Sequence, residues 1–141
     1  MKKWLKRLGI GLAVVLIVAQ FIPVPRSNPA EHNLIEAPGE VQALLQRSCD
    51  DCHSNETKWP WYARVVPMSL LIARDVKDGR RKLNFSVWER YDTAGKARKK
   101  KEIVREVKKG NMPPWYYVAF HPDAKLSSNE REIILKWADQ P

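Results

Sequence analysis

The sequence CDDCH at residues 49–53 contains both cysteines of this 141-residue chain, and a histidine follows them directly. On a helical turn, two thiols with this spacing lie on one side and can react with the same group. Four hypotheses address the pattern: unrelated thiols, a redox-active thiol pair, a zinc site, and a site for covalent c-type haem. Each of them places a different demand on the rest of the chain.

Three of the four hypotheses are not supported by CDDCH and its surrounding sequence alone. Unrelated thiols do not explain the adjacent histidine, and a redox pair is expected in a βαβ pattern, which this sequence lacks. A structural zinc site needs four ligands. CDDCH supplies three of them, so His32 or His121 would have to be the fourth. A haem uses all three residues, because Cys49 and Cys52 bind the porphyrin and His53 binds the iron. We therefore predict one covalent haem c with its iron.

The ligand on the other side of the iron decides between electron transfer and chemistry on a substrate. Met112 lies in GNMPP, where two prolines stiffen the loop that presents the sulfur. His121, or an open position, is the alternative. His32 lies in a linker and is expected to be solvated, and Met68 is expected to pack in the core. His53 and Met112 are therefore the predicted iron ligands.

Aromatic residues flank both ligand segments and are expected to line the haem pocket. They are Trp59, Trp61, Tyr62, Trp115, Tyr116 and Tyr117. For any one of them, ordinary core packing is an equally good interpretation. Four arginines are candidates for binding the haem propionates: Arg47, Arg64, Arg80 and Arg81.

Residues 1–25 are typical of an N-terminal signal anchor. Four basic residues precede residues 8–24, which contain no charge and a single polar side chain, Gln20. As a helix this stretch is roughly 25 Å long, slightly less than the ~30 Å hydrocarbon core of a bilayer. The basic flank should stay in the cytoplasm, so the rest of the chain is expected to be exported. A cleaved signal peptide is the alternative, although the stretch ends in a poor cleavage site.

The remaining chain divides into a linker at 26–37 and a haem-binding domain at 38–141. Apolar residues recur at helical spacing and strand alternation is weak, so the domain is predicted to be all-α with long loops. Helices are expected from Pro38, as first helical residue, through CDDCH; over 68–77, with Gly79 as the stop; from Asn84 or Ser86 to Tyr91; over 95–109, ended by Gly110; and after a Ser127–Glu130 capping box. Residues 54–67 and 111–126 are expected to be loops.

The charge distribution limits the possible partners. The net charge is +9, but five of the 25 basic residues precede residue 27 and no acidic residue precedes Glu31. The exported part is therefore only mildly basic, and we expect no binding to nucleic acid. Residues 80–109 hold twelve basic and four acidic residues, so they can bind an acidic redox partner. A solvated helix face, attracted to anionic lipids, is the simpler interpretation.

A series of short motifs runs along the chain in a fixed order: CDDCHSN, WPWY, PMS, DVKDGR, KLNFS, GNMPPWYY, LSSNE and a final KWA. In this order the chain resembles the haem-binding domain family of small bacterial membrane-anchored cytochromes c and, more distantly, class I cytochrome c. The resemblance covers about residues 15–138. It implies a compact cytochrome c-like helical fold around a haem at Cys49 and Cys52, with His53 proximal and Met112 distal. It also implies a single-pass protein of the bacterial inner membrane with the haem domain in the periplasm.

The predicted function is the transfer of one electron between respiratory or other redox partners. Ligation by histidine and methionine leaves no free position for a substrate, so we expect an electron carrier rather than an enzyme. The alternatives are a peroxidase-like enzyme and a haem-based sensor. Both need an open or displaceable distal position, and the enzyme also needs an acid or base above the iron, for which His121 is the candidate.

Overall fold

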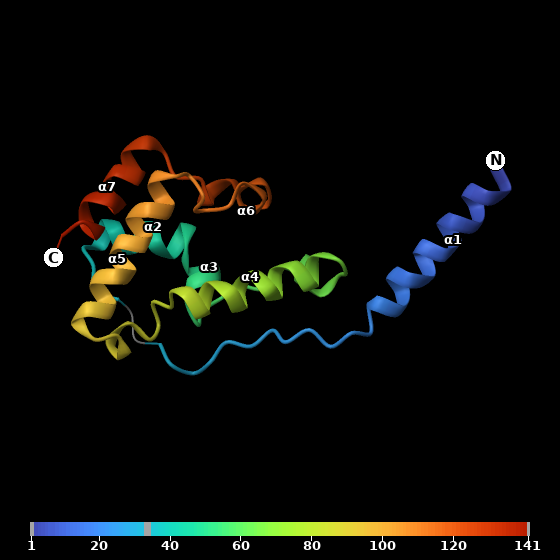
Figure 1. Cartoon of the computed structure of the whole chain (residues 1–141), viewed down its shortest axis with the longest axis horizontal. Helices are drawn as coiled ribbons and strands as arrows, with labels where there is room; N and C mark the ends of the chain where they lie inside the picture. The colour runs from blue at the N-terminus through green and yellow to red at the C-terminus, as the bar shows by residue number, and fades with distance from the viewer. Residues whose placement is uncertain (1, 33–34, 141) are drawn as a thin grey trace.

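The computed structural model describes residues 2–32 and 35–140, and all regular elements in those residues are helical. The predicted all-α class is thereby confirmed. The α-helices are α1 (Lys2–Ala19), α2 (Gly39–Ser48), α3 (Asp50–His53), α4 (Met68–Lys82), α5 (Thr93–Lys108), α6 (Trp115–Phe120) and α7 (Ser128–Ala138), arranged as in Figure 1. Short 3₁₀ helices lie in the connections: η1 (Trp61–Arg64), η2 (Trp88–Arg90) and η3 (Pro122–Ala124).

The hydrophobic core lies where α2, α5 and α7 meet. In Figure 1 these helices form one side of the domain, and α5 and α2 both pack against α7. The larger buried side chains between them are Leu44, Leu45, Ile103, Val107, Ile134 and Trp137. Burying one such side chain contributes roughly 1.5–3 kcal/mol, so this core holds α2 in place and with it the start of CDDCH.

Local sequence determines the ends of the two C-terminal helices. Asp92 caps α5 by accepting a hydrogen bond from the backbone N–H of Gly95 at 2.7 Å. Gly110 follows α5 with φ of +70°, a left-handed conformation that glycine adopts without strain. The predicted capping box at the start of α7 is confirmed, since Ser127 and Glu130 accept hydrogen bonds from each other's backbone N–H groups.

Two predicted helix boundaries near the site were wrong. Pro38 lies at the N-cap of α2, one position before the first helical residue. α4 continues to Lys82, so Gly79 lies inside the helix instead of ending it. Gly79 has no side chain, and this allows α4 to pack closely against α3. A glycine that allows close packing cannot be told from a glycine that ends a helix by the neighbouring sequence alone.

Two other segments also differ from the prediction. In place of the helix expected after Asn84 or Ser86, the structure has only the 3₁₀ turn η2. Both side chains are buried and hydrogen-bonded to Asn55, so they are not free to cap a longer helix. Part of the expected loop at 111–126 is the short helix α6. α6 has only six residues, and most of them are aromatic or apolar. A helical period therefore cannot be recognised in its sequence.

The N-terminal helix differs from the predicted anchor. It begins at Lys2, within the basic segment, and ends at Ala19, five residues before the expected end. Among residues 2–32 and 35–140, no helix combines the length and the apolar character needed to cross a membrane, so the predicted transmembrane helix is not supported. Pro23 and Pro25 lie just beyond the end of α1 and oppose its continuation.

The linker between α1 and α2 has no regular structure in its described part, but it is bound to the domain. The guanidinium of Arg26 donates to the carbonyl of Ala63 at 3.2 Å, and the amide of Asn28 donates to the carbonyl of Thr57 at 3.0 Å. Residues 33–34 of the predicted linker lie outside the described residues. These bonds draw residues 26–28 onto the loop that follows CDDCH.

Candidate haem site

The CDDCH sequence forms a separate helical turn after α2, so the prediction of one continuous helix from Pro38 through CDDCH was wrong. Cys49 has φ of −130° and ψ of −37°, which breaks the helix between Ser48 and Asp50. Its carbonyl then accepts hydrogen bonds from the backbone N–H groups of Cys52 at 3.1 Å and His53 at 3.0 Å. This single turn brings both thiols and the imidazole to one cavity wall, as predicted from their spacing.

The imidazole of His53 is oriented by a backbone carbonyl. Its Nδ1 lies 3.0 Å from the carbonyl oxygen of Leu83, and because a carbonyl only accepts, Nδ1 carries the proton. Burial lowers the pKa of His53, so the ring is neutral near pH 7. The lone pair therefore resides on Nε2, the nitrogen left to bind a metal.

Both cysteines are free thiols in half-buried positions. Burial, followed by the charges of neighbouring groups, raises the pKa of Cys49 and of Cys52 to about 12. A redox-active pair depends on a thiol whose pKa is low enough to form a thiolate near pH 7. The environment of this pair has the opposite effect and gives the redox hypothesis no support.

The zinc hypothesis required a further histidine. His32 is half-exposed and lies 3.2 Å from the carboxylate of Glu56, whereas His121 faces the cavity. In the part of the chain that the structure describes, no three His, Cys, Asp or Glu side chains are grouped so that they could hold a metal ion.

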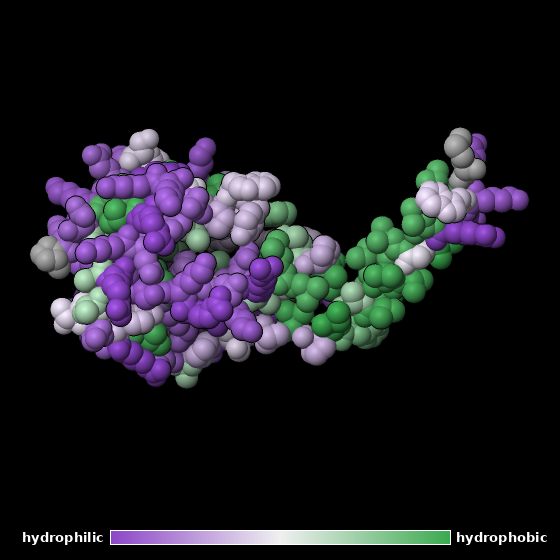
Figure 2. Space-filling model, in the orientation of Figure 1, coloured by the Kyte–Doolittle hydropathy of each residue, from purple (hydrophilic) through white to green (hydrophobic). Residues whose placement is uncertain are grey.

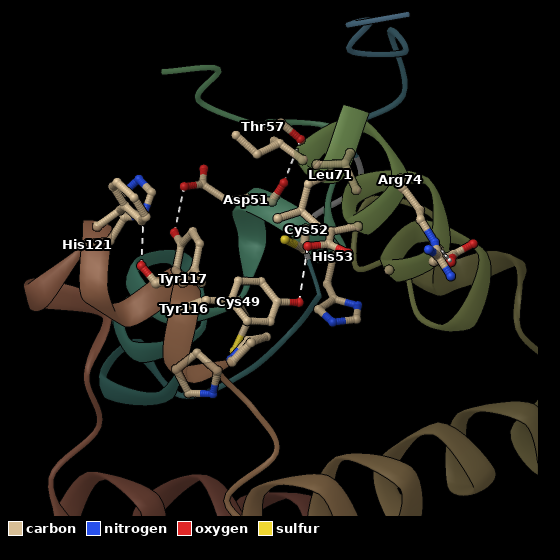
Figure 3. Close-up of a pocket in the computed structure, with 18 of the residues that line it drawn as sticks. Cys49, Asp51, Cys52, His53, Thr57, Leu71, Arg74, Tyr116, Tyr117 and His121 are labelled. Atoms are coloured by element: carbon tan, nitrogen blue, oxygen red, sulfur yellow. Dashed lines mark hydrogen bonds and ion pairs between the residues drawn. The ribbon is translucent and has the colours of Figure 1, made fainter. Parts of the chain in front are cut away.

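The cavity beside CDDCH has a volume of about 300 Å³ and is shown in Figure 3. Its walls come from α3, α4, α6 and the loops before α4 and α6. Apolar side chains form much of its lining: Met68, Leu71, Ile72, Val76, Met112, Pro113, Pro114 and Phe120. The hydroxyl of Ser48, also in the lining, is buried without a hydrogen-bond partner in the described residues. A mostly apolar space with two thiols and a neutral imidazole on one wall fits a covalently held haem.

Three of the four side chains considered as the distal ligand line this cavity, and His32 does not, but the three differ in how they are engaged. His121 donates from Nδ1 to the carbonyl of Tyr117 at 3.1 Å, and its Nε2 accepts from the hydroxyl of Tyr62 at 3.1 Å. Both of its ring nitrogens are therefore occupied. Met112 and Met68 have no hydrogen bonds among the residues that the structure describes, so their thioether sulfurs are the candidate iron ligands that remain. Met68 lines the cavity, whereas it was expected to pack in the core.

The aromatic residues predicted to line the pocket divide into two groups. The three tyrosines Tyr62, Tyr116 and Tyr117 line the cavity. The tryptophans do not: Trp61 is 77% exposed, Trp115 is 81% exposed, and the Nε1 of Trp59 donates to Asn28 in the linker at 3.2 Å. Trp59 and Trp61 thus lie outside the predicted lining, because the WPWY loop turns its indoles away from the cavity.

Hydrogen bonds fix the tyrosine side chains within the cavity. Tyr117 donates to a carboxylate oxygen of Asp51 at 2.7 Å, and Tyr116 donates to Asp75 at 3.1 Å (Figure 3). Burial, the first of several causes, raises the pKa of both hydroxyls, so both remain protonated near pH 7. These two bonds attach α6 to α3 and α4 across the cavity.

Three of the arginines expected to bind the haem propionates are already bonded to groups of the protein. Arg80 donates to the carbonyls of Ser54 at 2.7 Å and Ser27 at 2.8 Å, and also to Asn28 and Thr57. Arg47 pairs with Glu130 at 2.7 Å, and Arg81 pairs with Asp78 at 3.1 Å. Arg80 thus holds the linker against CDDCH rather than presenting a free guanidinium to the cavity.

Gly79 and Leu83 are site residues that no motif in the sequence marks as such. Gly79 allows α4 to approach α3, and Leu83 supplies the carbonyl that orients His53. The glycine in DVKDGR was visible, but it was interpreted as a helix end. A backbone carbonyl acts independently of its side chain, so no residue-type pattern marks Leu83.

Comparison with known proteins agrees with this geometry. Residues 14–140 match the family model described as a haem-binding domain. The chain is also similar to the cytochrome c peroxidase Ccp of Escherichia coli (strain K12), with 28% identity over 97 residues, which is 67% of this chain. The match covers 21% of that protein, so this chain corresponds to about a fifth of its length. No solved structure matches the chain significantly.

Proposed function

Because this chain belongs to the haem-binding domain family, we propose that it is a c-type haem protein that carries one electron at a time between redox partners. The observation that carries the proposal is the arrangement of CDDCH. Two free thiols line the same cavity as a neutral imidazole whose Nδ1 is bonded to Leu83. That leaves one nitrogen of His53 for iron and two thiols for covalent attachment.

The two cysteines can attach a haem without any further reactant. Cys49 and Cys52 would hold the haem through thioether bonds to its two vinyl groups, each made by adding one S–H across one C=C bond so that no group is released. When bound, the haem supplies an iron that alternates between Fe(III) and Fe(II) by gaining and losing one electron. No other co-reactant is needed.

The chain's own residues hold and tune the group. His53 binds through Nε2, and the Leu83 carbonyl keeps that ring in one tautomer and orientation. We propose that Met112 would supply the second iron ligand, because its sulfur has no hydrogen bond among the described residues, whereas both nitrogens of His121 are engaged. Buried apolar side chains such as Val76 would exclude water from the haem, which together with methionine ligation would raise the reduction potential.

A peroxidase-like activity is the second candidate, favoured by the similarity to the cytochrome c peroxidase of Escherichia coli. Reduction of hydrogen peroxide to two waters consumes two electrons from an external donor and two protons. The hydrogen-bonded pair of Tyr62 and His121 lines the cavity and can supply protons there. This reaction requires that Met112 leave the iron, so it is separable from electron transfer by experiment.

The partner and the location belong to the same proposal. Exposed basic residues follow one face of α5, namely Arg98, Lys101, Arg105 and Lys108, and Lys109 comes directly after the helix. They fit an acidic redox protein, and reduction by such a partner should slow as salt rises, since exposed charges are screened. We further propose that the domain lies in the periplasm of a bacterium and is attached to the inner membrane through the exposed apolar side chains of α1.

Optical spectra test the haem proposal. The full chain is produced with a c-type haem maturation system, and the oxidised and reduced spectra are recorded with and without carbon monoxide. We expect haem that stays with the polypeptide on acid extraction, a weak ferric band near ~700 nm from methionine ligation, and no carbon monoxide binding. The band should be lost in Met112→Ala and kept in Met68→Ala, the matched control.

Other results would decide against parts of the proposal. Ready binding of carbon monoxide by the wild type would show an open distal position and favour the peroxidase. Loss of the band in Met68→Ala alone would assign the distal position to Met68. Absence of haem from the mature chain would overturn the central claim.

A further inference from the structure

Six large apolar side chains are exposed on the helical domain, and they come from η1, the residue after it, the start of α4, and α6. They are Trp61, Val65, Leu70, Leu71, Trp115 and Phe120, which we call the apolar rim. In the described residues that follow Ile22, no other large apolar side chain is exposed. Single exposed apolar residues are normal when scattered over a surface, but a group confined to one place indicates an interaction site.

The apolar rim is contiguous with the haem cavity. Leu71 and Phe120 line the cavity from α4 and α6, two segments about fifty residues apart. Tyr62 connects two members of the rim. Its ring centroid lies 5.7 Å from that of Trp61 and 5.2 Å from that of Phe120. Leu71 and Phe120 thus lie in the cavity lining, and Trp61 lies beside it through Tyr62.

Hydrogen bonds hold the end of α1 beside this rim. The side chain of Gln20 donates to the carbonyl of Arg64 at 2.6 Å and accepts from the backbone N–H of Val66 at 3.1 Å. In Figure 1 the start of α4 and the helix α6 both lie at the end of the domain that faces α1. Figure 2 shows apolar surface running from α1 to the start of α4.

We propose that the apolar rim docks the domain onto the surface of a phospholipid bilayer, with the haem cavity facing the lipid. This inference deepens the proposed attachment through α1 and does not depend on haem binding. A bilayer covers α1 and the rim together, whereas a protein seated on the rim alone would leave α1 exposed. Tryptophans such as Trp61 and Trp115 favour the interface between lipid and water, and Arg64 beside them can pair with anionic head groups.

Quenching by brominated lipid tests the docking. The full holoprotein is reconstituted in phosphatidylcholine–phosphatidylglycerol vesicles with brominated acyl chains. A fluorophore is attached to a cysteine introduced as Trp61→Cys or Trp115→Cys, positions exposed enough to tolerate it. Lys101→Cys on α5 is the matched control, and Leu12→Cys reports on α1. We expect the label at positions 61 and 115 to be quenched at least about twofold more than at position 101, because it lies in the interface.

The outcomes separate the proposals. Quenching at position 12 without quenching at 61 and 115 would overturn the docking, and the rim would then be a site for a protein. No quenching at positions 12, 61 and 115 would overturn docking and attachment together, and quenching at 61 and 115 without quenching at 12 would overturn only the attachment through α1. In the wild type, haem attachment consumes Cys49 and Cys52, so uptake of label by the wild type would mean that the haem proposal had failed. In that case the same labels in a Cys49→Ser, Cys52→Ser chain test the docking by themselves.

Discussion

Gly79 in α4 lies directly against the backbone carbonyl of Cys52 in α3. A β-carbon at position 79 would overlap the carbonyl oxygen, and the carbonyl carbon would be 3.1 Å away. These are backbone atoms that cannot rotate aside as a flexible side chain does. The helix that forms one wall of the cavity therefore reaches the CDDCH turn only because residue 79 has no side chain.

Substitution Gly79→Ala should destabilise the protein. Alanine favours a helix over glycine by about 1 kcal/mol, but overpacking against a backbone typically costs about 1–3 kcal/mol and separates α3 from α4. Urea unfolding of the full chain measures the change. Gly39→Ala is the matched control, because a β-carbon there meets no atom within 4 Å. Equal stability of Gly79→Ala and wild type would show that the two helices are free to shift.

Arg80 should be essential for holding the linker to the site. Its guanidinium makes four hydrogen bonds, to Ser54, Ser27, Asn28 and Thr57, in a geometry that the lysine ammonium cannot reproduce. We expect Arg80→Lys to lower the free energy of unfolding by about 1–3 kcal/mol. Arg81→Lys, at a position with an exposed ion pair, should change it by less than about 1 kcal/mol. Similar losses in both variants would contradict this role.

A buried polar network beside CDDCH should be sensitive to the loss of one hydroxyl. Ser86 is 1% exposed and accepts from the backbone N–H of Asn55 at 2.9 Å, while the amide of Asn84 donates to Asn55 at 2.9 Å. Ser86→Ala leaves a buried N–H without a partner, which should cost about 1–3 kcal/mol in urea unfolding. The exposed control Ser128→Ala should stay close to wild type. An unchanged midpoint for Ser86→Ala would mean that another group replaces the hydroxyl.

The contribution of Glu130 to the free energy of unfolding should depend on pH. Hydrogen bonds from the backbone of Ser127 and from Arg47 lower the pKa of this carboxyl from 4.5 to about 2. A lowered pKa in the folded state means that the stabilisation is complete above the unfolded value of 4.5 and is lost as the pH falls toward 2. The difference in unfolding free energy between wild type and Glu130→Gln should therefore shrink over that range.

Acid unfolding with a matched variant checks this dependence. The two chains are unfolded in urea at several pH values, together with Glu132→Gln, an exposed position on the same helix. Glu132→Gln should track the wild type throughout. A constant difference between wild type and Glu130→Gln from neutral to acidic pH would contradict the assignment.

The sequence by itself determined the features that depend on residues close together in the chain. The capping box at Ser127 and the end of α5 at Gly110 each follow from a few neighbouring side chains and backbone preferences. The all-α class followed from periodicity along segments. These interactions have their physical cause within one or two helical turns, so a linear pattern contains it.

Tertiary structure alone decided which side chains face the cavity. Tyr62 and His121 are 59 residues apart and become partners only when η1 packs near α6. The indole of Trp61, next to Tyr62, points to solvent instead. The role of Gly79 depends on a carbonyl 27 positions earlier in the chain. Burial and close contact between distant segments are collective results of packing, and residue type at one position does not reveal the neighbour that packing will bring to it.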